Sequence, residues 1–106
     1  MALNSLTALS MLHLIFQSPI ETAILERIDS GDVVVFLENA VLRILQNSNI
    51  RNLLVQKINT SRFCVLSDDI AVRGIAPDEL VSGIEVIDYA GLVELTVNHP
   101  VIQSWT

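Results

Sequence analysis

Residues 33–37 have the sequence VVVFL, an unbroken run of apolar side chains. A strand exposed on one face alternates apolar and polar residues, whereas a strand covered on both faces is apolar throughout. The run therefore predicts an inner strand of a sheet that has helices on both faces. Residues 11–16, MLHLIF, show the same pattern with His13 as the interruption and predict a second such strand.

Helix signals follow each of these strands. Residues 18–21 (SPIE) have the form of a capping box, Pro19 suits the first helical position, and Gly31 is suited to end that helix. Asn39 is placed to cap a further helix that extends to Leu45.

The second half of the chain repeats this alternation. Strands are expected over 62–66 and 84–87, and helices over 50–57 and 67–74. Asp88 is placed to cap a last helix that ends before Pro100. The residues expected to share one face of that helix are Tyr89, Leu92, Val93 and Thr96. The alternation indicates an α/β fold, a single open, mostly parallel four-stranded sheet with helices on both faces.

Length and composition favour a small subunit. The chain has 106 residues, and we expect one domain over 11–106 preceded by an extension over 1–10. Hydrophobic residues make up 51% and charged residues 17% of the chain, whereas about 25% of residues are charged in typical soluble domains. A domain of this size cannot bury so much apolar surface by itself, so we expect a patch that contacts a partner subunit.

The net charge excludes some partners. Twelve acidic and six basic side chains give a formal charge of −6, which disfavours direct binding of nucleic-acid phosphates or of an anionic membrane. The apolar run at 11–16 is far shorter than the roughly 20 residues that span a bilayer. Any link to RNA is therefore expected to be indirect.

Cys64 is the only cysteine, which excludes an internal disulfide and favours a reducing, cytoplasmic location. A thiolate could carry persulfide sulfur. Cys64 lies inside the strand expected over 62–66, however, where a small buried hydrophobe is the favoured interpretation. Arg62 falls on the same face of that strand, which keeps a reactive thiolate as the alternative.

The sequence predicts neither a metal site nor a cofactor site. His13 and His99 lie far apart and have no second ligand near them, and none of the four glycines belongs to a phosphate-binding loop. We expect His13 to be a strand residue whose ring is satisfied by hydrogen bonds, and His99 to be a polar residue in a helix-ending turn.

Four residues are candidates for an interface. Asp69 and Arg73 are spaced for an ion pair on one helical face, an arrangement that is more common than an acid/base pair. Tyr89 and Trp105 combine aromatic area with a polar atom, which suits a subunit contact or the edge of a core.

The expected carboxyl ends of the strands are polar and acidic, at residues 17, 38–39, 67–68 and 88–89. Ligands and partners of parallel sheets collect at such ends. A self-associating domain that binds a small ligand there is one of the functions left open.

An ordered set of motifs resembles the DsrH/TusB family, which belongs to the DsrE/DsrF/DsrH-like group. The motifs include 65–74 (VLSDDIAVRG), 86–89 (VIDY), 95–100 (LTVNHP) and the terminal Trp105. Together with residues 11–13, 18–19 and 30–39, they extend the resemblance over nearly the whole chain after residue 10.

The resemblance implies a role in a cytoplasmic relay that passes persulfide sulfur between proteins. It implies a heterohexamer with two copies each of three related subunits, so the expected partners are TusC/DsrF-like and TusD/DsrE-like subunits. In one branch of the family the sulfur ends in 2-thiouridine at the wobble position of tRNA, and in another branch it enters dissimilatory sulfur oxidation.

The chain departs from the family pattern at two places. Some relatives have a thiol in the first helix, but residues 21–28 (ETAILERI) contain none and Cys64 does not match that position, so no catalytic residue is carried over. Ala40 stands where relatives often have glycine, and Asn39 is expected to form the turn as a cap instead. We favour a non-catalytic subunit, with a sulfurtransferase that uses Cys64 as the alternative.

Overall fold

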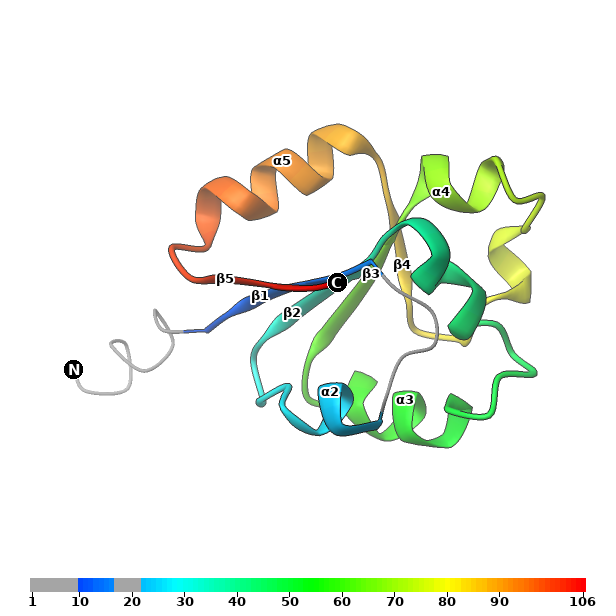
Figure 1. Cartoon of the computed structure of the whole chain (residues 1–106), viewed down its shortest axis with the longest axis horizontal. Helices are drawn as coiled ribbons and strands as arrows, with labels where there is room; N and C mark the ends of the chain where they lie inside the picture. Colours follow the sequence, from blue (N-terminus) through cyan, green and yellow to red (C-terminus); the bar gives the residue numbers. More distant parts are fainter. Residues whose placement is uncertain (1–9, 17–21) are drawn as a thin grey trace.

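The computed structural model describes residues 10–16 and 22–106 as an open sheet between two layers of helices (Figure 1). The strands are β1 (Leu12–Ile15), β2 (Val33–Phe36), β3 (Arg62–Leu66), β4 (Glu85–Ile87) and β5 (Ile102–Trp105). The α-helices are α2 (Thr22–Glu26), α3 (Arg51–Ile58), α4 (Ser67–Ala71) and α5 (Tyr89–Asn98), and the 3₁₀ helices are η1 (Glu38–Arg43) and η2 (Pro77–Glu79). The capping box expected at 18–21 lies outside the described residues, as does the expected extension over 1–10 apart from Ser10.

The sheet is parallel throughout, with the strand order β4-β3-β2-β1-β5. The prediction of four strands was wrong, because a fifth strand follows Pro100 and pairs with β1. The sequence of β5, IQSW, lacks the buried apolar run that marks the inner strands, and three of its four residues are exposed. An edge strand of this kind is held by its backbone ladder to β1, a feature that hydrophobic patterning does not detect.

The two faces of the sheet are covered unequally. On one face, side chains from α2, α3, α4 and η1 pack with alternate strand residues such as Val34, Phe36 and Phe63. On the other face, α5 is the helix that contributes to the core, through Leu92 and Leu95 (Figure 1). The expected helices on both faces are therefore confirmed, but among the described helices α5 alone packs on one of the faces.

The helix expected from Asn39 to Leu45 is instead the 3₁₀ helix η1, which begins at Glu38 and ends at Arg43. Asn39 does not cap it, because Leu37 occupies the cap position and no side chain caps the helix. The turn is formed by Glu38, whose φ of 50° lies in the left-handed region. The residue with the left-handed backbone is therefore Glu38, two positions before Ala40.

Helix α5 begins as its sequence predicts, because the Asp88 carboxylate accepts a hydrogen bond of 2.8 Å from the Gly91 amide. The four residues expected to share one face lie within this helix, but that face is only partly buried. Leu92 packs inward with Leu95, whereas Tyr89 and Val93 are exposed.

Among the described helices, none has the length and apolar character that crossing a membrane requires.

Candidate functional site

Asp69 and Arg73 join the carboxyl ends of β2 and β3. Asp69 lies in α4, directly after β3, and its carboxylate accepts a hydrogen bond of 2.7 Å from the Glu38 amide, directly after β2. The Arg73 guanidinium donates to the Asp69 carbonyl oxygen at 2.9 Å and to the Asn39 side-chain oxygen at 3.0 Å. We call Glu38, Asn39, Asp69 and Arg73 the strand-end clamp.

The strand-end clamp explains how a glutamate adopts a left-handed backbone. That conformation costs an ordinary residue about 1–2 kcal/mol, and the hydrogen bond to an ionised carboxylate offsets a cost of this size. The predicted ion pair is present but long, with 3.8 Å between Arg73 Nη1 and Asp69 Oδ1. The geometry is that of a structural brace between two loops.

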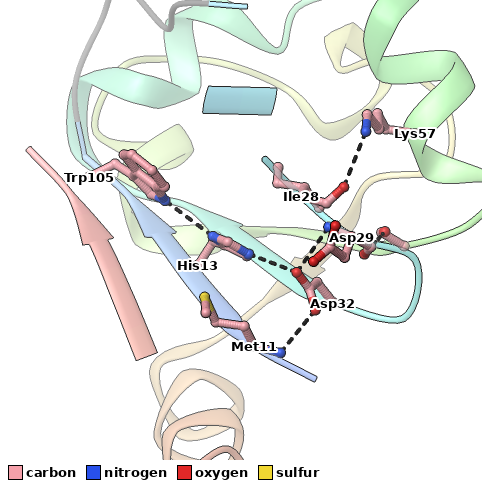
Figure 2. Close-up of polar contacts among 8 residues, drawn as sticks. Met11, His13, Ile28, Asp29, Asp32, Lys57 and Trp105 are labelled. Atoms are coloured by element: carbon pink, nitrogen blue, oxygen red, sulfur yellow. Dashed lines mark hydrogen bonds and ion pairs between the residues drawn. The ribbon is translucent and has the colours of Figure 1, made fainter. Parts of the chain in front are cut away.

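A second cluster of polar side chains packs against one face of the sheet and connects β1, β5 and the loop before β2 (Figure 2). The imidazole of His13 in β1 lies between Asp32, which precedes β2, and Trp105 of β5 (Figure 2). The indole Nε1 donates to His13 Nδ1 at 3.1 Å, and His13 Nε2 lies 2.9 Å from Asp32 Oδ2. Because an indole N–H can only donate, Nδ1 is the acceptor and Nε2–H donates to the carboxylate.

Asp32 is held as a carboxylate by several donors. It is 5% exposed and accepts hydrogen bonds from the amides of Met11 at 2.9 Å and Asp29 at 3.0 Å as well as from His13. Burial by itself raises the pKa of this carboxyl, but the hydrogen bonds from Met11, His13 and Asp29 outweigh burial and hold the pKa below its usual value of 3.8. The carboxylate therefore fixes the loop before β2 against the start of β1.

The His13–Asp32 pair has the composition of an acid/base pair but not an accessible nitrogen. His13 is 2% exposed, and both of its ring nitrogens are occupied by protein partners. The expectation that His13 is a strand residue with a satisfied ring is confirmed. His99 lies at the end of α5, as expected, with its Nδ1 in a 2.7 Å hydrogen bond to the Leu95 carbonyl oxygen.

Cys64 is fully buried in the core beneath α5, as its strand position predicts. Burial raises the pKa of its thiol to about 11, although the positive charge of Arg62 acts in the opposite direction. Arg62 is itself engaged, since its guanidinium forms a two-pronged pair with Glu85 at 2.7 and 3.1 Å. At neutral pH the sulfur is a protonated, inaccessible thiol, which is a poor nucleophile.

The four candidate interface residues do not form one site. Tyr89 follows β4, at one edge of the sheet, and Trp105 ends β5, at the other edge. Tyr89 is exposed, whereas Trp105 is half-buried, bonds to His13 and lies under the guanidinium of Arg27 at 5.7 Å. The strand-end clamp lies between these edges, at the ends of β2 and β3.

Ser67 and Asp88 line a shallow depression next to the strand-end clamp, together with Val86, Ile87 and Gly91. The depression lies at the carboxyl ends of β3 and β4, where the sequence predicts ligands or partners to collect. Within residues 10–16 and 22–106, no group of three or more histidine, cysteine or acidic side chains is arranged to hold a metal ion.

Comparison with known proteins identifies the family. The family model for DsrH-like proteins matches residues 16–102 of this chain. Protein TusB of Yersinia enterocolitica is 32% identical over 98 residues, which cover 90% of this chain and all of the relative. Protein TusB of Buchnera aphidicola is 33% identical and that of Escherichia coli K12 is 30% identical, with the same coverage.

The chain belongs to the DsrH/TusB family. It is a TusB-like sulfur-relay protein. Its fold is shared with the protein of unknown function MTH1491 from Methanobacterium thermoautotrophicum, with a TM-score of 0.72 and 15% identity over 91% of this chain and 97% of the other. The ychN protein of E. coli gives a TM-score of 0.71 and 14% identity over 91% and 99% of the two chains. At these identities the two structures support the fold.

For a DsrH/TusB protein, the arrangement of the polar residues has a clear consequence. The buried polar groups of this chain are used to hold strands and loops, and its thiol is enclosed.

Sequence reasoning missed Asp32, which is the centre of the buried network. The signal was a charged residue that immediately precedes an inner, wholly apolar strand, a place where an acidic side chain needs buried donors.

Proposed function

We propose that this chain is a non-catalytic subunit of a cytoplasmic sulfur-relay complex that delivers persulfide sulfur for 2-thiolation of the tRNA wobble uridine. The observation that carries the proposal is the state of Cys64, a fully buried thiol whose pKa is raised to about 11, in a chain of the DsrH/TusB family. A persulfide carrier must expose a thiolate to donor and acceptor proteins. The sulfur is therefore carried by cysteines of the partner subunits.

The partners in this proposal are TusC/DsrF-like and TusD/DsrE-like subunits, assembled with this chain as a heterohexamer. The name TusB of the relatives in Yersinia, Buchnera and E. coli supports the tRNA branch over dissimilatory sulfur oxidation. The acidic balance of the chain supports a role without direct RNA contact, since tRNA phosphates would be repelled.

Co-expression with the two related subunits tests the assembly. A tagged copy of this chain is expected to retain both subunits through size-exclusion chromatography, and native mass spectrometry is expected to give two copies of each chain. A chain that elutes alone under the same conditions contradicts the proposal.

Persulfide mapping tests the non-catalytic role. The complex is incubated with a cysteine desulfurase and cysteine, and persulfidated peptides are located by mass spectrometry. The expected result is persulfide on a partner cysteine, with the same yield for wild type and for Cys64→Ser. Persulfide on Cys64 contradicts this role and supports a sulfurtransferase.

Deletion of the gene in the native host separates the two branches. Loss of 2-thiouridine from the tRNA pool, restored by the wild-type chain and by Cys64→Ser, is the expected result. Unchanged tRNA thiolation together with impaired sulfur oxidation assigns the chain to the other branch.

A further inference from the structure

Helix α5 presents an apolar stripe to solvent. Its inward face carries Leu92 and Leu95, which pack on the sheet. Its outward face carries Tyr89, Val93 and Val97, which are 64%, 43% and 77% exposed and lie one helical turn apart. The stripe is about 12 Å long, since a helix rises 1.5 Å per residue.

The stripe is unusual because it lies on α5, which among the described helices is the one that covers its face of the sheet (Figure 1). Single exposed valines are common on protein surfaces, but an unbroken apolar row at i, i+4 and i+8 is the pattern by which helices dock into grooves. Polar residues flank this apolar row on the exposed surface of α5, namely Glu94 and Asn98.

Charge is distributed very unevenly along the chain. Residues 74–106 contain no lysine or arginine and five acidic residues, which are Asp78, Glu79, Glu85, Asp88 and Glu94. This third of the sequence therefore carries −5 of the formal charge of −6. The charge of Arg62 interacts with that of Glu94, but Arg62 is already paired with Glu85.

Of these acidic residues, Asp88 and Glu94 lie at the start of α5 and on α5, Glu85 lies in the adjacent β4, and α5 itself contains no lysine or arginine. This local charge selects the occupant of the stripe. A second copy of the chain would bring two acidic surfaces together, and an anionic membrane would repel the same surface. A groove bordered by lysine and arginine complements both the apolar row and the acidic flank.

We propose that the α5 stripe, Tyr89, Val93 and Val97, docks into an apolar groove bordered by basic side chains on a partner subunit. This assignment rests on the proposed function, because it takes the partner to be one of the two related subunits of the relay complex. It places the principal contact on α5 and not at the strand-end clamp or Trp105.

The chain offers a matched control for this proposal. Val55 in α3 and Val72 after α4 are 42% and 77% exposed, nearly the same as Val93 and Val97. The test variant is Val93→Arg with Val97→Arg, and the control variant is Val55→Arg with Val72→Arg. Both variants gain the same charge at sites of equal exposure, so both are expected to fold alone with wild-type circular dichroism and melting curves.

Each variant is co-expressed with the two related subunits, and affinity is measured by titration of the isolated chain against the partner subunits. The test variant is expected to bind at least about tenfold more weakly than wild type, and the control variant within about twofold. Glu94→Lys is expected to weaken binding and to lower its salt dependence, whereas Glu26→Lys, an exposed acid on α2, leaves both unchanged.

The outcomes separate the two proposals. If wild type assembles and the test variant assembles equally well, the α5 assignment is overturned while the proposed function stands. If wild type fails to assemble with either subunit, the proposed function falls and this assignment falls with it. A wild-type chain that dimerises by itself through α5, measured by sedimentation, overturns the choice of occupant.

Discussion

The indole Nε1 of Trp105 donates a hydrogen bond of 3.1 Å to Nδ1 of His13, although the two residues are 92 positions apart in the chain. This bond between side chains links the edge strand β5 to β1, in addition to the backbone hydrogen bonds that pair the two strands. It also fixes the tautomer of His13 and so directs Nε2–H towards Asp32. The two hydrogen bonds on the His13 ring thereby connect β5 through β1 to the loop before β2.

Replacement of Trp105 by phenylalanine is expected to destabilise the fold by roughly 1–3 kcal/mol. The phenyl ring keeps most of the apolar contact, but the buried Nδ1 of His13 loses its donor, and a buried unsatisfied group of this kind carries such a penalty. Urea unfolding followed by circular dichroism measures the change. Gln103→Ala, on the same strand but exposed, is the control and is expected to change the free energy of unfolding by less than about 0.5 kcal/mol.

Asp32 should make stability depend on pH in the acid range. Its pKa is lower in the folded chain than the ordinary value of 3.8, so its contribution is complete above that value and is lost as the pH falls through the lower folded pKa. Asp32→Asn removes this contribution and is expected to be less stable than wild type by about 1–3 kcal/mol at neutral pH. The difference between the two proteins should shrink below about pH 4.

Urea titrations of both proteins at several pH values measure this difference. A gap between wild type and Asp32→Asn that stays constant from neutral pH into the acid range contradicts the role of an ionised Asp32. Asp29→Asn is the control, since the structure uses the amide and carbonyl of Asp29 rather than its carboxylate.

Local patterning predicts the strands and helices that bury apolar side chains. The run 33–37 contains β2 and the segment 62–66 is β3, and Arg62 is the one exposed residue of these two strands. The Asp88 cap is predictable because capping depends on residues close together in sequence. Hydrophobic burial and capping are thus readable without the fold.

Contacts between distant segments account for what patterning misses. β5 exists because β1 offers a free backbone edge, and Glu38 adopts its left-handed conformation because Asp69, 31 residues later, accepts its amide hydrogen bond. The position of the pair Asp69 and Arg73 was predicted, but its partners Glu38 and Asn39 were not, since their approach depends on the adjacency of β2 and β3.

The strand-end clamp predicts unequal roles for two adjacent aspartates. Asp69→Ala removes the acceptor of the Glu38 amide and is expected to destabilise the fold by about 1–2 kcal/mol, because the left-handed backbone of Glu38 then lacks its compensating bond. Asp68→Ala is the control, since Asp68 is exposed in the same helix turn and is expected to have an effect below about 0.5 kcal/mol. Equal losses for the two variants, measured by urea unfolding, contradict the clamp.

The enclosed thiol of Cys64 predicts slow alkylation in the folded state. At pH 8 a thiol with a pKa of about 11 is almost entirely protonated, and the Cys64 side chain has no exposed surface. Iodoacetamide can therefore react with Cys64 only after the fold opens locally. Mass spectrometry is expected to show at least about a hundredfold slower labelling of the native chain than of the chain in urea. Rapid labelling of the native chain would mean that the core beneath α5 opens readily, and the sulfur would then be available for persulfide exchange.

Cys64→Ala tests the same interpretation by substitution. The variant is expected to lose about 1 kcal/mol of stability through a small cavity, while it assembles with the partner subunits and supports sulfur transfer as wild type does.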